Sequence, residues 1–139
     1  MRFMIIVRAT ATTEAGIFPE DDTVMPDMAA FHEELQKAGV LLDANGLKPS
    51  SAGWRIRYGA DGKRAVVDGP FAETKELIAG YTLIEVRTRE EAMEWARRFP
   101  APMGRNVAAE IEVRPLYEMD DLPPNDSVER MRELDSVRR

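Results

Sequence analysis

His32 and Asp68 are the two residues whose types and positions best fit proton-transfer chemistry. Histidine titrates closer to neutral pH than other side chains, so an imidazole can accept and donate a proton under physiological conditions. Asp68 directly precedes Gly69 and Pro70, which give the chain a sharp path that can hold the carboxylate in one place. A carboxylate can orient an imidazole or act as a base itself. We therefore name His32 and Asp68 as candidate catalytic residues.

Both residues also have a structural interpretation. His32 lies four residues after Met28 and three before Leu35, so it borders the apolar stripe of a predicted helix and could bond a backbone carbonyl. Asp68 could accept the amide hydrogens of its own turn. The sequence leaves both alternatives open.

Three charged residues, Glu73, Lys75 and Arg114, are candidate ligand-binding groups. Glu73 and Lys75 follow the turn at Asp68, and Lys75 could meet an anionic ligand there. Arg114 lies on the predicted last strand, where an ion pair could fasten the charged turn to the sheet. The alternative is a solvated loop, because exposed ion pairs contribute little. We expect the cleft of the protein beside this turn.

Composition narrows the chemistry further. The chain has 139 residues, no cysteine and one histidine, which excludes disulfides, thiolate catalysis and zinc–sulfur sites. No loop has EF-hand spacing, so we expect neither a metal nor a cofactor. The net charge of −6 disfavours nucleic-acid binding, which needs a basic face. Without a signal sequence or a long apolar run, we expect a cytoplasmic protein with no membrane partner.

The first half of the chain predicts a strand, a helix and three more strands. Residues 3–7 are apolar on both faces, which indicates a strand in the centre of a sheet. A helix is predicted from Pro26, which suits a first helical position, to Gly39, which ends it. The next strands are expected at 40–42, 54–58 and 65–67, the last two joined by a hairpin turn at Asp61-Gly62.

The second half predicts a strand, a helix and a strand. The strand is expected at 81–86, the helix from Thr88 to Phe99 with Glu91 completing a capping box, and the last strand at 109–115. The order β-α-β-β-β-α-β predicts an α+β sandwich of ferredoxin-like type with an added hairpin. Two helices cover one face of such a sheet. We therefore predict a homodimer that covers the other face.

The chain is expected to divide into a domain at 1–117 and a tail at 118–139. The tail opens with the acidic, proline-containing linker "EMDDLPPND". A short helix follows, with Val128, Met131 and Leu134 at a spacing of three. Because a helix of this length is marginal alone, it either docks on the domain or frays.

Four segments of the chain resemble the YCII-related family, in the branch named for its Asp-Gly-Pro-Phe signature. They are "FHEELQKAGVLLDANGL", "DGPFAETKELIAGY", "REEAMEWARRFP" and "EIEVRP". The resemblance implies a dimeric α/β barrel in which two ferredoxin-like units stack sheet against sheet. It also implies that some relatives are encoded beside sigma factors of the extracytoplasmic type. Short-chain relatives act as lyases on chlorinated hydroxyquinols and are credited with a His–Asp pair.

In these relatives the histidine lies near the start of the first helix, a position that falls near Met28 here. His32 lies one helical turn later, on the same helix face, which departs from the family position; whether His32 replaces the family histidine stays open. Our leading interpretation is a cofactor-independent enzyme, a lyase, hydrolase or isomerase, acting on an unknown small molecule. The alternative is a non-catalytic ligand-binding or regulatory module linked to sigma-factor control.

Overall fold

The computed structural model describes residues 1–138, so that Arg139, the last residue of the expected tail, lies outside the described residues. The larger sheet is formed by β1 (Arg2–Arg8), β2 (Leu41–Gly46), β5 (Ile78–Glu85) and β6 (Ile111–Pro115), and a hairpin by β3 (Trp54–Tyr58) and β4 (Arg64–Asp68). The α-helices are α1 (Ala11–Glu14), α2 (Val24–Lys37), α3 (Arg89–Arg97) and α4 (Asp126–Arg138). Short 3-10 turns, η1 (Ser50–Ala52), η2 (Thr74–Glu76) and η3 (Met119–Asp121), lie between them.

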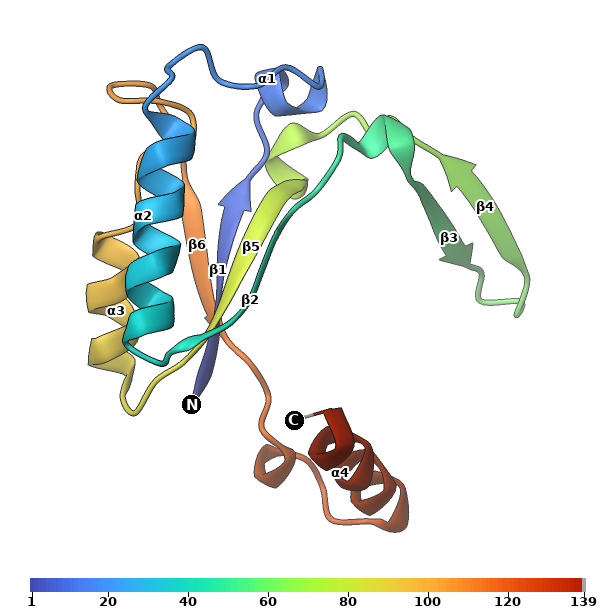
Figure 1. Cartoon of the computed structure of the whole chain (residues 1–139). Helices are drawn as coiled ribbons and strands as arrows, with labels where there is room; N and C mark the ends of the chain where they lie inside the picture. The colour runs from blue at the N-terminus through green and yellow to red at the C-terminus, as the bar shows by residue number, and fades with distance from the viewer. Residues whose placement is uncertain (139) are drawn as a thin grey trace.

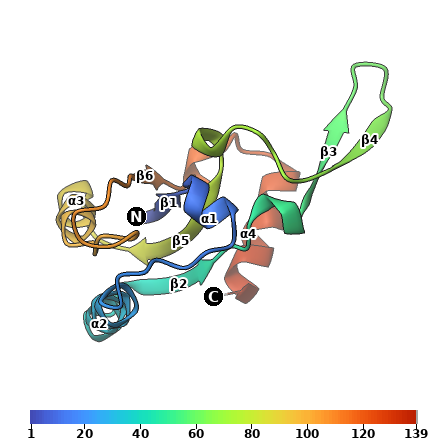
Figure 2. The same ribbon diagram turned by 90° about the horizontal axis from the view of Figure 1, so that it is seen from above.

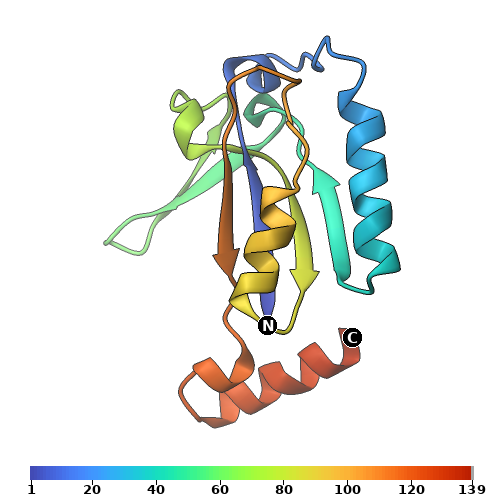
Figure 3. The same cartoon turned by 90° about the vertical axis from the view of Figure 1, so that its left-hand side faces the viewer.

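The larger sheet confirms the predicted ferredoxin-like α+β fold. Its strand order is β2-β5-β1-β6 with every neighbouring pair antiparallel, and α2 and α3 lie together on one face (Figure 1). Turned to bring the helices forward, the same layering shows α2 and α3 in front of the sheet (Figure 3). The β3–β4 hairpin is inserted between the second and third strands of this sheet.

β1 lies between β5 and β6, as its two apolar faces predict. Phe3 and Ile5 are buried in the core under the helices, together with Phe31 and Leu35 of α2 and Ile84 of β5. Burying a large apolar side chain contributes about 1.5–3 kcal/mol, so this cluster holds α2 on the sheet. Phe99, which packs against this cluster, also lines the cavity of the candidate functional site.

The two long helices show two differences from the expected signals: α2 begins at Val24, so that Pro26 is its third residue and not its first, and the capping box of α3 is incomplete. Gly39 has a φ of 75° directly after α2, the left-handed conformation that suits glycine at a helix end. The Thr88 hydroxyl accepts the amide hydrogen of Glu91 and caps α3. The Glu91 carboxylate, however, accepts from the amide of Arg87 instead of completing the predicted capping box.

Among residues 1–138, no helix covers the opposite face of the large sheet, since α4 lies at one end of the strands (Figure 1). Met4 and Ile6 of β1 lie on it beside Leu83 and Tyr81 of β5, and all four are half-buried. Arg114 and Glu112 of β6 flank this apolar centre on one side, and Asp43 and Asn45 of β2 flank it on the other. We call this surface the open sheet face.

The tail forms a helix, α4, that is tied to the domain through its linker. Asn125 caps α4 by accepting the amide hydrogen of Val128, which is itself buried. The Glu118 carboxylate accepts from the guanidinium and the backbone amide of Arg2. Burial alone would raise the pKa of Glu118, but these hydrogen bonds hold that pKa below its usual value. None of the helices described is long and apolar enough to cross a bilayer.

Candidate functional site

A cavity of about 560 Å³ lies between α2, the loop that joins α1 to α2, and the β2–β5 edge of the sheet. Its walls are mostly apolar, with Met28 of α2, Ala44 of β2 and Phe99 among them. The polar residues that line it include His32, Lys48 and Thr82; Asn45 and Tyr81 also line it, but their side chains lie on the open sheet face. Within residues 1–138, no carboxylate lines this cavity. Small-molecule sites have this character, with apolar walls and a few convergent polar groups.

His32 lies at the centre of the polar groups, bonded through both ring nitrogens. Its Nδ1 atom lies 2.7 Å from the carbonyl oxygen of Met28, one turn back along α2. Its Nε2 atom lies 2.8 Å from the hydroxyl oxygen of Thr82 on β5. The ring also meets Phe31 and Phe99 edge to face, with centroids 5.5 Å and 6.3 Å away. The imidazole is therefore fixed in one orientation at the cavity wall.

These contacts assign the protonation of the neutral imidazole. A carbonyl oxygen only accepts, so Nδ1 carries the hydrogen and donates it to Met28. Nε2 then has a free lone pair, which accepts the hydroxyl hydrogen of Thr82. An imidazole with one nitrogen oriented by an acceptor and the other facing a hydroxyl is poised as a base.

Thr82 is the residue of this site that sequence reasoning missed. It is 2% exposed and lies between Ile5 of β1 and Ala44 of β2 in the sheet register. A buried hydroxyl requires a hydrogen-bond partner, and His32 supplies it. The signal that could have found Thr82 is one hydroxyl on the otherwise apolar face of a strand, with Gly80 and Ile84 as its buried neighbours.

Asp68 lies away from this cavity. It ends β4, is exposed, and faces Trp54 across the hairpin, which forms a sheet of its own. Asp68 does not line the cavity, and both ring nitrogens of His32 are bonded elsewhere. Within the single chain, the two candidate catalytic residues are therefore not brought together.

The Asp-Gly-Pro-Phe turn instead anchors the hairpin to the domain. The peptide bond between Gly69 and Pro70 is cis. The amide of Phe71 donates to the hydroxyl oxygen of Ser50 at 3.0 Å, and the Ser50 hydroxyl and amide both donate to the Glu14 carboxylate. A Cβ atom at Gly69 would lie 1.9 Å from the carbonyl oxygen of Ser50. Only glycine fits this close backbone approach.

The three candidate ligand-binding residues also lie apart. Glu73 and Lys75 are exposed in and beside η2. Arg114 faces Met4 on the open sheet face and pairs with Glu112 at 3.8 Å. Leu77, which follows η2, is bonded to Ala9. Ala9 is five residues along the strand from Met4, which corresponds to about 16 Å. The predicted ion pair of this turn to Arg114 is therefore absent from the structure, where Arg114 pairs with Glu112.

Asp21 fastens the end of the loop that leads into α2, a role the sequence did not indicate. Its carboxylate accepts from the hydroxyl and amide of Thr23 and from the amide of Arg105. These hydrogen bonds, that of the Thr23 hydroxyl first, lower the pKa of Asp21 from 3.8 to about 2. Asp21 thereby joins the start of α2 to the loop after Met103, another wall residue.

Comparison with known proteins defines the family. Residues 1–119 match the YCII-related domain. The chain belongs to the YCII-related family. This chain is similar to an uncharacterized protein of Rhizobium meliloti (strain 1021). The two are 34% identical over 113 residues, which cover 81% of this chain and 90% of that protein. The Asp-Gly-Pro-Phe branch of the YCII-related family stays a prediction. In residues 1–138, no three His, Cys, Asp or Glu residues gather in a cluster that could hold a metal ion.

Proposed function

We propose that this YCII-related protein binds a small, mostly apolar molecule in the cavity and that His32 exchanges a proton with it. One observation carries the proposal: His32 lines the cavity with Nδ1 bonded to the Met28 carbonyl and Nε2 facing the Thr82 hydroxyl. This arrangement supplies an oriented base without a cofactor. The reaction class is that of a lyase, isomerase or hydrolase.

The walls of the cavity support one class of ligand. An aromatic or branched aliphatic body suits the apolar walls, which include Met28, Ala44 and Phe99. Lys48 is an exposed cation among the lining residues and suits a ligand with an acidic hydroxyl or a carboxylate. Small phenols and aromatic carboxylates combine both features.

In the proposed reaction, the proton moves from the ligand to the Nε2 atom of His32. The ligand gives its proton to the Thr82 hydroxyl oxygen as this hydroxyl passes its own hydrogen to Nε2; a direct transfer to Nε2 requires the Thr82 hydroxyl to turn its hydrogen away first. The imidazolium that forms keeps its Nδ1–H bond to the Met28 carbonyl, which favours the charged ring. The Thr82 oxygen has lone pairs to accept the new Nε2–H bond when the ligand has left.

A binding module that performs no chemistry is the second candidate. It is favoured by the absence of a carboxylate among the lining residues of the described chain. Such a module needs the cavity and not the basicity of His32. The two candidates differ in one respect: proton exchange changes the protonation of His32 when the ligand binds.

We further propose a homodimer formed through the open sheet face. The half-buried Met4, Ile6, Tyr81 and Leu83 support it, because a sheet face with an apolar centre requires cover. Sedimentation at micromolar concentration tests this, and a stable monomer contradicts it.

A thermal-shift panel of small phenols and aromatic carboxylates tests the ligand proposal. Ala44 is the register neighbour of Thr82, so Ala44→Phe fills the cavity beside His32. Ala30→Phe makes the same change at an exposed position of α2 and serves as the matched control. We expect a compound that stabilises wild type and Ala30→Phe but not Ala44→Phe. A panel in which no compound stabilises the wild type, or in which Ala44→Phe responds equally, contradicts the proposal.

A further inference from the structure

The β3–β4 hairpin has an apolar face that stays exposed in the described part of the chain, residues 1–138. Trp54, Ile56 and Tyr58 alternate on β3, and Val66 faces Ile56 from β4. Trp54 is 65% and Tyr58 68% exposed. A two-stranded hairpin is marginal by itself in water, and a group of exposed aromatic and aliphatic side chains marks a contact surface.

The hairpin is basic in a chain of net charge −6. It carries four cations, Arg55, Arg57, Lys63 and Arg64, against two anions, Asp61 and Asp68. Arg55 stacks over Phe71 and Arg64 over Tyr58, so both also contribute aromatic contacts. Among residues 1–138, Arg57 and Lys63 form no ion pair.

The C-terminal segment has the complementary character. Residues 118–129 contain five carboxylates, Glu118, Asp120, Asp121, Asp126 and Glu129, and no lysine or arginine. Met131, Leu134 and Val137 follow at a spacing of three along α4, and Leu134 is 65% exposed. This segment therefore joins an acidic stretch to an apolar stripe.

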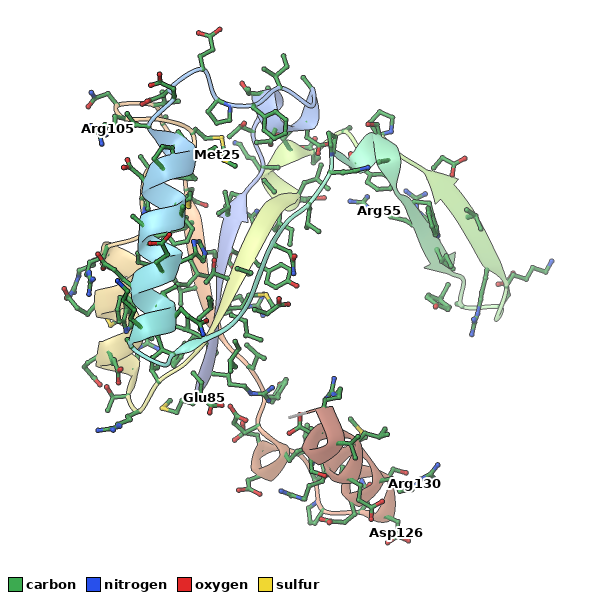
Figure 4. All side chains as sticks on the ribbon, in the orientation of Figure 1. Met25, Arg55, Glu85, Arg105, Asp126 and Arg130 are labelled. Carbon is green, nitrogen blue, oxygen red and sulfur yellow. The ribbon has the colours of Figure 1, made fainter. Side chains whose placement is uncertain are left out.

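Both elements project from the same side of the domain. Figure 1 shows the hairpin and α4 on the side of the large sheet that faces away from α2 and α3, one near each end of the strands. Seen from above, the hairpin again extends away from the helix layer (Figure 2). With side chains drawn, Arg55 lies on the upper element and Asp126 and Arg130 lie on the lower one (Figure 4). The two elements flank the open sheet face.

We propose that in the homodimer the hairpin of each copy binds the C-terminal segment, residues 118–138, of the other copy. The inference rests on the proposed homodimer and adds the pairing of these two elements to it. A two-fold axis perpendicular to the strands and parallel to the sheet brings the upper element of one copy against the lower element of the other. The contact then forms twice, with the apolar face of the hairpin against the apolar stripe of α4 and Arg64, the cation on that same face, towards the acidic stretch.

The competing arrangement places hairpin against hairpin. It would set two basic elements side by side, which like-charge repulsion disfavours. A contact between the hairpin and the α4 of its own chain is a third arrangement. It is disfavoured because the two lie at opposite ends of the strands (Figure 1).

Cross-linking of the full chain distinguishes the three arrangements, because the natural sequence has no cysteine. Tyr58→Cys labels the hairpin and Leu134→Cys labels α4, both at exposed positions. Each single variant, the double variant and a control, Lys37→Cys on the exposed end of α2, are treated with a flexible bis-maleimide. Circular dichroism checks that every variant folds.

We expect covalent dimer from the double variant at about tenfold or more above the control, because contact within a dimer raises the effective concentration. The single variants should stay at the control level. Internally linked monomer from the double variant, or covalent dimer from Tyr58→Cys alone, overturns the proposal. A dimer in sedimentation without any cross-link above the control overturns the pairing but leaves the homodimer. A monomer in sedimentation overturns both.

Discussion

The Nε2 atom of His32 lies 2.8 Å from the hydroxyl oxygen of Thr82, which joins the middle of α2 to the buried face of β5. Fifty positions in the sequence separate the two residues. The contact satisfies a buried hydroxyl and orients the base that the proposed function requires. It therefore has both a structural and a functional consequence, and substitutions can separate them.

Thr82→Val should destabilise the protein by about 1 kcal/mol, because valine keeps the shape but leaves the half-buried Nε2 atom of His32 without its donor. Thr82→Ser keeps the hydroxyl and should retain the ligand response of the wild type. Urea unfolding and the thermal shift with a hit from the panel measure the two effects. A Thr82→Val protein with wild-type stability and ligand response contradicts the assignment.

Gly69→Ala should destabilise the hairpin anchor by at least about 2 kcal/mol, because the new Cβ atom would meet the Ser50 carbonyl oxygen. Gly46→Ala is the matched control, since a Cβ atom there meets nothing within 4 Å. Urea unfolding measures global stability, and hydrogen exchange of the Phe71 amide reports the anchor itself. Unchanged exchange at Phe71 in Gly69→Ala is the contradicting result.

Acid should weaken the loop that Asp21 fastens. The pKa of Asp21 is about 2 in the folded protein, below its ordinary value of 3.8, so the carboxylate stabilises the folded state fully above about pH 4. That contribution is lost as the pH falls from 4 to 2, where the folded protein binds the proton. The difference in melting temperature between wild type and Asp21→Asn should therefore be largest above pH 4.5 and shrink towards pH 2. A difference that is constant across this range contradicts the expectation.

Asp68→Asn tests whether Asp68 belongs to the site. The stability should stay within about 1 kcal/mol of wild type, because the turn is anchored by Gly69 and Phe71 and asparagine keeps the shape. If the charge of Asp68 serves the site, Asp68→Asn should lower the turnover of, or the affinity for, a compound found in the thermal-shift panel by roughly a hundredfold. An equal response in wild type and Asp68→Asn assigns Asp68 to the scaffold.

Much of the fold could be predicted because periodicity reports burial. Residues 3–7, apolar on both faces, lie in the middle of the sheet. Gly39 lies at the predicted end of α2, and Thr88 at the predicted start of α3. Several elements differ, among them α2, which begins at Val24 and not at Pro26, and β5, which begins at Ile78 and not at Tyr81. α1 is four residues long, too short for a hydrophobic period. β2 extends to Gly46 through Asp43 and Asn45, poor strand formers that pairing with β5 keeps extended.

The site was less accessible to sequence reasoning because its contacts join distant elements. Residue types led to His32, and its helix position predicted the bond to a backbone carbonyl. Thr82 could be identified only through the packing of α2 on β5. The Asp-Gly-Pro-Phe signature predicted a sharp turn, but turn chemistry fixes local backbone and not the direction in which a hairpin projects. Asp68 was therefore expected beside His32, whereas the hairpin carries it away from the cavity.

The most direct test of the central claim is nitrogen-15 NMR of the imidazole, whose signals are unambiguous because His32 is the one histidine in the chain. In the free protein above neutral pH, we expect a protonated Nδ1 and an unprotonated Nε2. Titration with phenol or benzoate, or with the strongest hit of the panel, should shift the Nε2 signal towards the protonated form as the cavity fills. Ala44→Phe should show no such change. A free protein with the hydrogen on Nε2, or a saturating cavity ligand that leaves the Nε2 signal unmoved, contradicts the account.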